Sequence, residues 1–539
     1  MNARFLGLLF LILISGVGAF FLGRMTAPPV ENPNYTNPSA ATGPRKSGAQ
    51  RAEAAAAAAA ITPVEPEEIP ESDATVEKVP SLTQAELAAL NAKLVLPPRP
   101  TEKRLAWFYH TTVDAYLASG VRGGKWDQLA VDGLWLLGRY WAKDSKPVEA
   151  EQVIGALKLA MDNGCTDPLV KYGHVRAAEY FIGYQPSKPF ISAASQIKTT
   201  TYPAIRRAMP QVLAASHLWY SEKNHTEPMR RRCLLLMEVA FKLLPEVFAD
   251  NDTSPRELYG YCEDMMNMYF NLYGVRKTAF DKIMPAIEAA RPDSSIGLAF
   301  AAEFNTDYAW DARGSGWANT VTPKGWADFG ERLGLARDAA TRAYQKDPAD
   351  PTAPTQMLTV ALGSNYERPQ MEVWFTRAMR ADPDNLTACN SKLYYLLPRW
   401  HGSREAMLEF GNQCVQRVEE NTDRNVELAE MLVSAHKWLA EDWANANPNR
   451  DQSGYWMQES VWSDVKRVFT LILERRPNSN HYHSSYASYA SSCGKWVESN
   501  QQYKLITNPE LAIFGTLEEF ARRRAQAANE SAHVKTEQF

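Results

Sequence analysis

The residues best suited to chemistry lie in one short stretch. Asp307, Asp311 and Arg313 lie there beside Trp310 and Trp317, and glycines at positions 314 and 316 predict a loop. Two neighbouring carboxyl groups can perform acid–base catalysis when the pKa of one of them is raised. An arginine beside them opposes this, because its positive charge keeps both groups ionised. We therefore interpret the stretch as a structural network that ties the loop to neighbouring helices; a ligand site and a catalytic site are the alternatives.

The rest of the chain offers little catalytic chemistry. It contains no phosphate-binding glycine loop, no His-Glu-x-x-His motif and no nucleophile elbow. His481 and His483 are two residues apart, and side chains at that spacing do not share a helix face, so we expect no metal site there. Arginine runs at 230–232 and 522–524 are typical of solvated helix faces. We therefore expect no cofactor, no metal and no enzyme activity.

Two of the six cysteines are expected to meet. Helices from about residue 385 to 397 and from about 403 to 417 form a predicted hairpin whose turn centres on Trp400. Cys389 lies eleven residues before Trp400 and Cys414 lies fourteen after it, so their depths in the hairpin agree to within about one turn, ~5 Å. We expect contact between the thiols and, if the domain is exported, a disulfide, which needs Cα atoms within about 7 Å. Two separate buried thiols are the alternative.

The element that must position these residues is a repeated helical unit. The octet Thr341–Pro348 is echoed by Thr376–Pro383 with five identical positions at a spacing of 35 residues, close to the roughly 34-residue period of tetratricopeptide helix pairs. Apolar residues recur at intervals of three and four, and each Asp-Pro ends a helix. One pair cannot bury its apolar face alone, so we expect further pairs on both sides, with Trp374 and Phe375 between units. The predicted fold is all-α, a tetratricopeptide-like α-solenoid.

Aromatic, glycine and Asp-Pro motifs mark the stretch from about residue 305 to 417. They are Tyr308–Gly314, Val321-Thr322, Gly325-Trp326, the octet ending at Asp347-Pro348, Trp374-Phe375 with Ala378, Asp382-Pro383, Lys392–Leu396, Pro398–Ser403 and Met407–Phe410. Together these motifs resemble an uncharacterised bacterial family of tetratricopeptide-like proteins, the domain of unknown function 4034. The resemblance implies an α-helical repeat fold. It implies no catalytic residues, because no activity is established for that family.

The N-terminal segment is apolar enough to enter a membrane. Residues 5–23 carry no charge, and nineteen helical residues at about 1.5 Å each nearly span a bilayer core of roughly 30 Å. We expect a single-pass anchor, with the bulk of the chain exported to the periplasmic or envelope side. A signal peptide cleaved after Ala19, which would leave a secreted protein, is the main alternative, and a tail without targeting meaning is another. Apolar residues 20–22 continue past that cleavage site and favour the anchor.

Composition divides the chain into five parts. Prolines at 186, 189, 203 and 210 also predict a less regular stretch within the helical region at 81–295. A linker at 25–80 is expected either to hold the folded part away from the membrane or to be a low-complexity insert that the protein tolerates. The expected parts are the anchor or signal peptide at 1–24, a disordered linker rich in proline, alanine and glutamate at 25–80, an N-terminal helical region at 81–295, tetratricopeptide-like repeats at 296–530 and a disordered tail at 531–539.

Charge and composition narrow the choice of function. The chain has 58 basic and 62 acidic residues and a net charge of −4, so it gives no electrostatic case for a nucleic-acid partner. Its fifteen tryptophans are expected mostly in the core, with some lining a surface where aromatic side chains anchor a peptide. The leading hypothesis is a membrane-tethered scaffold that binds a protein or peptide. The alternatives are a small-molecule binder or enzyme that uses the stretch 307–317, and a structural component of an envelope or secretion assembly.

Overall fold

The computed structural model describes most of the chain after the predicted linker. Described are residues 83–142, 148–179, 187–221, 225–250, 253, 255–292, 294–314, 318–422, 424–446, 449 and 451–537. The predicted membrane segment at 5–23, the linker and Trp317 lie outside these residues. Among the described residues, no helix is both long enough and apolar enough to cross a bilayer.

The prediction of an all-α fold is confirmed, and the described residues contain no β-strand. The first half of the chain forms α3 (Gln84–Asn91), α4 (Lys103–Tyr109), a π-helix (His110–Asp114), α5 (Ala115–Ser119), α6 (Asp127–Ala142), α7 (Ala150–Asp162), α8 (Pro168–Ala178), α9 (Ser187–Ile197), α10 (Ala204–Ser221), α11 (Glu227–Ala249), α12 (Pro255–Tyr273) and α13 (Arg276–Ala290).

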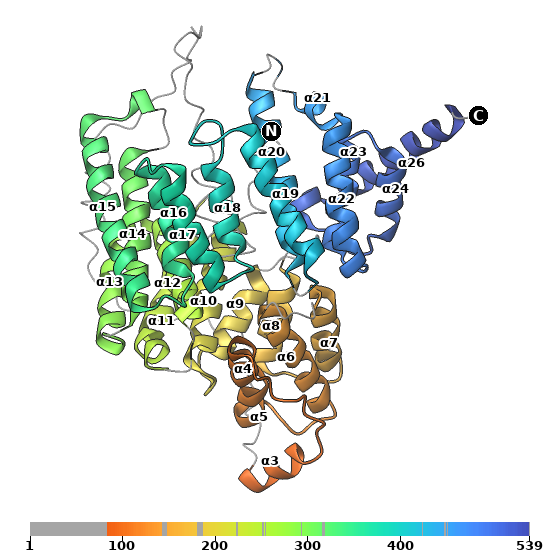
Figure 1. Ribbon diagram of the computed structural model, residues 1–539. Coiled ribbons are helices and arrows are strands. Elements are labelled where there is room, and N and C mark those ends of the chain that lie inside the picture. The colour runs from red at the N-terminus through yellow and green to blue at the C-terminus, as the bar shows by residue number, and fades with distance from the viewer. Residues whose placement is uncertain are drawn as a thin grey trace.

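The second half continues the same pattern of helices joined by short loops (Figure 1). It forms α14 (Ser295–Arg313), the 3-10 helix η2 (Ala318–Thr320), α15 (Pro323–Lys346), α16 (Thr352–Gly363), α17 (Arg368–Ala381), α18 (Leu386–Tyr395), α19 (Arg404–Glu420), the 3-10 helix η3 (Val426–Ala429), α20 (Glu430–Ala446), α21 (Ser453–Trp456), α22 (Glu459–Arg475), α23 (Asn480–Ser492), α24 (Trp496–Leu505), α25 (Leu511–Phe514) and α26 (Leu517–Glu537).

The proline-rich stretch around residue 200 is more regular than its sequence predicted. It forms α9 and α10, with Pro203 just before the first residue of α10 and Pro210 inside that helix. Proline removes one backbone hydrogen bond of a helix interior, a loss that packing must offset. Here Ala208, Val212 and Ala215 are completely or almost completely buried on the same helix. Tertiary burial thus overrides the local preference against helix.

The repeated octet forms the ends of two equivalent helices. Lys346 is the last residue of α15 and Ala381 is the last residue of α17, and each is followed by the Asp-Pro pair that stops the helix. These two helices bury one face only, whereas the intervening helices α16 and α18 are buried on almost all sides. This alternation is what stacked helix pairs require, since each pair covers the apolar face of the next.

The core is continuous across the predicted boundary at residue 295. Phe300 and Phe304 of α14 belong to the apolar cluster that α10–α13 build, whereas Ala309 and Trp310 of the same helix belong to the cluster that extends to α23. One helix therefore contributes to both halves of the stack. At the other end, α26 continues to Glu537, beyond the predicted end of the ordered chain at residue 530.

The stack curves until its ends approach each other. In Figure 1 the lower end of α22 comes close to α7, whereas α26 extends away from it. A side-chain contact confirms this approach, because Arg476 at the end of α22 forms an ion pair with Glu149 at the start of α7, 2.7 Å away. The described helices thus trace a superhelix that closes on itself.

Burial differs sharply between the two aromatic residues expected between repeat units. Phe375 is buried, packs edge-on against Phe410 at 5.6 Å, and lies under the Lys392 ammonium at 4.2 Å. Trp374 is only partly buried and packs against Tyr344 near the surface. The prediction is therefore confirmed for Phe375 and only in part for Trp374.

Replacing these two residues should reveal the difference. Phe375→Ala is expected to lower the free energy of unfolding by about 3–5 kcal/mol, because it leaves a cavity in the core. Trp374→Ala should have less than half of that effect, since solvent already reaches its ring. Urea unfolding followed by circular dichroism measures both values. Equal losses would show that the two rings are equally buried in solution.

Candidate functional site

The stretch 307–313 is helical, so the predicted loop is wrong. It forms the last two turns of α14, and the chain leaves the helix only at Gly314, which has a left-handed φ of 73°. Aromatic and charged residues alternate in this stretch, so its sequence shows no single apolar helix face. In the helix these residues separate onto two faces. Asp307 and Asp311 face α13, whereas Trp310 and Arg313 face α15 and the loop after α18.

The partner of the two aspartates is Arg276 of α13. Its guanidinium forms an ion pair with Asp307 at 2.8 Å, donates a hydrogen bond to Asp311 at 3.1 Å, and lies over the Phe270 ring at 4.2 Å. The sequence-based interpretation, an Asp–Arg network that ties this stretch to a neighbouring helix, agrees with this geometry. The arginine that forms the network is Arg276 rather than Arg313.

Two glutamates extend this network into the core. Glu263 of α12 is 1% exposed and Glu303 of α14 is 7% exposed, next to Asp307 at 1%. The Tyr259 hydroxyl hydrogen-bonds the Glu303 carboxyl, and the Gln356 amide of α16 donates to Tyr259. We call Glu263, Glu303 and Asp307, together with Tyr259 and Arg276, the carboxyl cluster.

Three carboxyl groups share one arginine in this cluster, so they cannot all be ionised at low cost. Burial raises the pKa of Glu303 to about 8, and the neighbouring Asp307 charge adds to this rise. Burial and the charge of Glu303 raise the pKa of Glu263 well above its ordinary value. Burial therefore favours the protonated, neutral form of both glutamates, and Arg276 forms its ion pair with Asp307.

A second group of side chains gathers where α14 ends. Aromatic rings and arginines from five elements interleave there: the end of α14, the start of α15, the end of α18, the loop between α18 and α19, and the middle of α20. We call this group the aromatic–arginine cluster. It consists of Trp310, Arg313, Trp326, Tyr394, Arg399, Trp400 and Trp438.

The first half of the aromatic–arginine cluster is built on Arg313. Its guanidinium lies 5.5 Å from the ring centre of Trp310 and 5.5 Å from that of Trp326. Trp310 is buried and packs edge-on against Phe329, whereas Trp326 is 42% exposed. Burial lowers the pKa of Arg313, although Tyr394 nearby partly offsets this. A cation held between two indole rings, one of them exposed, thus forms the outer edge of the cluster.

The second half is built on Arg399. Its guanidinium lies 5.7 Å from the Tyr394 ring and 5.5 Å from the Trp438 ring, and it donates to Asp442 of α20 at 3.2 Å. Its Nε and Nη2 atoms are buried, and no atom of the described residues accepts a hydrogen bond from them; the same holds for the indole Nε1 of Trp400. Such donors are uncommon in folded proteins, because each costs about 1–3 kcal/mol.

A tight loop presents Arg399 and Trp400. Within residues 396–403 the Trp400 N–H donates to the Leu397 carbonyl and the His401 N–H donates to the Tyr395 carbonyl. Gly402 closes the loop, because a Cβ atom there would meet the Leu396 carbonyl oxygen at 2.1 Å. Trp400 then packs edge-on against Trp310 at 6.0 Å, which joins the two halves of the aromatic–arginine cluster.

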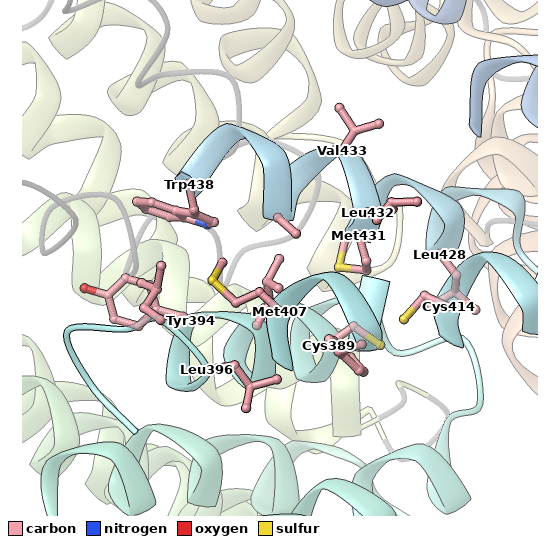
Figure 2. Packing of buried hydrophobic residues seen from close by; sticks show 14 of the residues in the cluster. Cys389, Tyr394, Leu396, Met407, Cys414, Leu428, Met431, Leu432, Val433 and Trp438 are labelled. Carbon is pink, nitrogen blue, oxygen red and sulfur yellow. The ribbon is translucent and has the colours of Figure 1, made fainter. Parts of the chain in front are cut away.

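The expected contact between two cysteines is also present. Cys389 of α18 and Cys414 of α19 lie at one end of a buried layer that has Tyr394 and Trp438 at its other end, and their sulfur atoms point toward one another (Figure 2). Both are free thiols, and hydrogen bonding with Cys414 together with burial raises the pKa of Cys389 well above its ordinary value. The disulfide stays a prediction.

The two histidines of α23 have separate partners. His481 bonds Glu510 at 2.9 Å, whereas His483 bonds Gln502 and the Pro477 carbonyl. Burial alone would lower the pKa of His481, but the Glu510 carboxylate raises it to about 9. Within the described ranges, no group of three or more histidine, cysteine or acidic side chains is placed to hold a metal ion.

Sequence reasoning missed the residues that complete both clusters. A signal for Glu303 was present, since it interrupts the apolar run Leu298–Ala302 of the same helix, and charges in such runs are seldom left unpaired. Arg276 gave no comparable signal, because it interrupts no apolar run and its partners Asp307 and Asp311 lie on the next helix of the chain. Arg399 and Trp400 were noted as part of a motif, but their unpartnered donors follow only from the fold.

The stacked helix pairs define a helical-repeat protein. Residues 349–429 match the model of a family described as a domain of unknown function, DUF4034, which confirms the resemblance to this family. The match includes the loop with Arg399 and Trp400 but begins after α14 and α15, so the stretch 307–317 lies outside it. No curated protein matches the chain.

Two solved structures align with most of this chain at low sequence identity and low TM-score. The structure of Naa15/Naa10 bound to HypK-THB aligns with 12% identity and a TM-score of 0.25, covering 83% of this chain and 73% of the other. The crystal structure of yeast Tom70 aligns with 11% identity and a TM-score of 0.22, covering 81% and 90%. TM-scores this low carry no argument about function.

The carboxyl cluster should make stability depend on pH. Between the ordinary glutamate pKa of 4.5 and about 8, folded Glu303 keeps a proton that the unfolded chain has released. The free energy of unfolding should therefore fall as pH rises through this window. Glu303→Gln removes this titration and keeps the shape, so we expect it to remove about 4 kcal/mol of the decline between pH 5 and 8.5. Urea unfolding at pH 5, 7 and 8.5 measures the slope.

Glu419→Gln is the matched control, because hydrogen bonds from Arg467 lower the pKa of this surface glutamate. Removing it should leave the decline between pH 5 and 8.5 unchanged. Parallel slopes for wild type and Glu303→Gln would contradict the protonated state of Glu303.

Proposed function

We propose that this chain is a helical-repeat scaffold that binds a protein or peptide partner through the aromatic–arginine cluster, without catalysis. One observation carries the proposal: the Trp326 ring is 42% exposed and lies 5.5 Å from the Arg313 guanidinium, at the outer edge of the cluster. A partner that packs on this ring and brings carbonyl or carboxylate oxygens to Arg313 would bury both side chains together.

The composition of the cluster supports a protein partner. Tryptophan, tyrosine and arginine are the residue types that contribute most to binding energy at protein interfaces. Here the arginines are already held in place by rings on either side, so little side-chain entropy is lost when a partner arrives. The net charge of −4 gives no support to a nucleic acid.

The carboxyl cluster supports binding without catalysis. Its carboxyl groups are at most 7% exposed, and Arg276 neutralises the charge of Asp307. An acid or base in catalysis must reach its substrate within hydrogen-bond distance. The enclosed position of Glu263 and Glu303 is typical of a structural network and leaves the surface of α14 to the aromatic–arginine cluster.

We also propose that residues 5–23 tether the scaffold to a membrane and that the bulk of the chain lies on the exported side, with secretion after cleavage as the alternative. The support is the uncharged run of nineteen residues. Residues 25–80 would then act as the spacer between the bilayer and the first described helix. A tether of this kind raises the local concentration of the scaffold near partners in the same membrane.

Crosslinking from position 326 tests the binding function. A photoreactive amino acid at Trp326 should capture a defined partner in native membranes, which mass spectrometry identifies, whereas the same group at Tyr220, which is 60% exposed, should not. Binding of the purified partner should weaken at least about tenfold in Trp326→Ser and in Arg313→Gln, the size expected for interface hot spots. Tyr220→Ser is the control. Equal affinity of all variants would place the binding surface elsewhere.

Cell fractionation tests the tether. Deleting residues 1–24 should move the chain from the membrane fraction to the soluble fraction, and the folded part should keep its helical circular dichroism. An N-terminal sequence beginning at Phe20 in the mature protein would instead establish cleavage after Ala19. Membrane association that persists without residues 1–24 would contradict the tether.

A further inference from the structure

The two ends of the superhelix meet at one small set of polar side chains. Arg476, which follows α22, donates two hydrogen bonds to the Glu149 carboxylate at 2.7 and 2.8 Å. The Asn480 side-chain amide of α23 donates to Glu151 of α7 at 2.8 Å. These contacts join residues more than three hundred positions apart in sequence. We call these four residues the polar seam.

The geometry of the polar seam is set on both sides. Glu149 is the residue that precedes α7, and its side chain forms a capping box with Gln152. On the other side, the Asn480 side-chain oxygen accepts hydrogen bonds from the backbone N–H groups of Thr507 and Asn508 at 2.7 and 3.0 Å. This fixes the amide so that its N–H group points toward Glu151.

No apolar core reinforces the polar seam. In the described parts of the chain, none of the buried apolar clusters combines residues of α3–α10 with residues beyond α18. From α4 to α26, helices that follow one another in the chain share such clusters. Ion pairs and hydrogen bonds close the superhelix, and Tyr140 of α6 lies beside them near Glu427 and Glu510. Interfaces of this polar kind are typical of parts that move relative to one another.

Both halves keep partners of their own when they separate. Arg476 also lies 3.5 Å from Glu427 and stacks over the Tyr482 ring at 5.1 Å, so its charge stays compensated without Glu149. Glu149 retains its capping box, and the Asn480 carbonyl retains its two backbone donors. Breaking the polar seam thus leaves no buried charge unpaired. An unpaired buried charge is what makes the loss of one partner of a buried ion pair so unfavourable.

We infer that the superhelix opens and closes at the polar seam. The closed state is the ring described above; in the open state α7 separates from the turn between α22 and α23, while every apolar contact of the stack is kept. This opening follows from the contacts of the fold alone and does not depend on the proposed binding function. Because the closing contacts are charged, salt weakens them and shifts the population toward the open state.

Fluorescence energy transfer between α7 and α24 tests this inference in the purified full-length chain. Dyes attached through non-natural amino acids at Leu159 and Leu505, which are 49% and 54% exposed, leave the native cysteines untouched. Single-molecule histograms should show a high-transfer state at 0.1 M salt and a growing low-transfer state toward 1 M, at which the Debye length falls to about 3 Å. Circular dichroism should stay constant throughout.

Substitutions locate the opening. Arg476→Gln and the double variant Glu149→Gln/Glu151→Gln should each raise the ratio of open to closed molecules about tenfold at 0.1 M salt, as expected for lost hydrogen bonds to charged groups. Arg467→Gln breaks a comparable two-bond ion pair, between α22 and Glu419 of α19, that does not cross the polar seam, and it should have no effect.

Three outcomes overturn the inference. One unchanged high-transfer state in wild type at every salt concentration would mean that the ring does not open. Equal opening in Arg467→Gln would place the movement outside the polar seam. Loss of helical signal together with low transfer would mean unfolding instead of opening. The salt series needs no substitution, so it decides the matter even if a variant fails to fold.

Discussion

The ion pair between Arg276 and Asp307 is the contact on which the middle of the molecule depends. A carboxylate that is 1% exposed is tolerated in a core only with a cation beside it, and Arg276 supplies that cation from α13. Burial alone would lower the pKa of Arg276, but Asp307 and Asp311 raise it, so the arginine stays charged. The pair holds α13 against α14. Since α14 also carries Trp310 and Arg313, the same contact sets the position of the aromatic–arginine cluster.

Periodicity and local stop signals made the architecture predictable from sequence. The octet with its Asp-Pro ending marks where α15 and α17 stop, and the capping box of Thr83 and Glu86 marks where the described helices begin. These signals are local, so the sequence displays them directly. The depth argument for Cys389 and Cys414 succeeded for a related reason, because one hairpin with a defined turn leaves little freedom.

What sequence could not supply was the pairing between distant helices. Asp307 and Arg313 are neighbours in the chain, yet the helical twist of α14 sends them to different faces, and Asp307 finds Arg276 instead. The same applies to Arg206 of α10, which is buried against the rings of Trp107 and Trp141 although prolines 203 and 210 argued against a helix there. Tertiary burial decided these cases, and burial is a property of the whole stack.

All six cysteines are buried, and burial raises the pKa of Cys165 and Cys493 to about 12. Thiolate is the form that oxidants and alkylating reagents attack, so burial makes Cys165 and Cys493 slow to react in the folded chain. A chain that reaches an oxidising compartment before it folds would expose all six thiols at once, whereas folding buries them and leaves Cys389 beside Cys414.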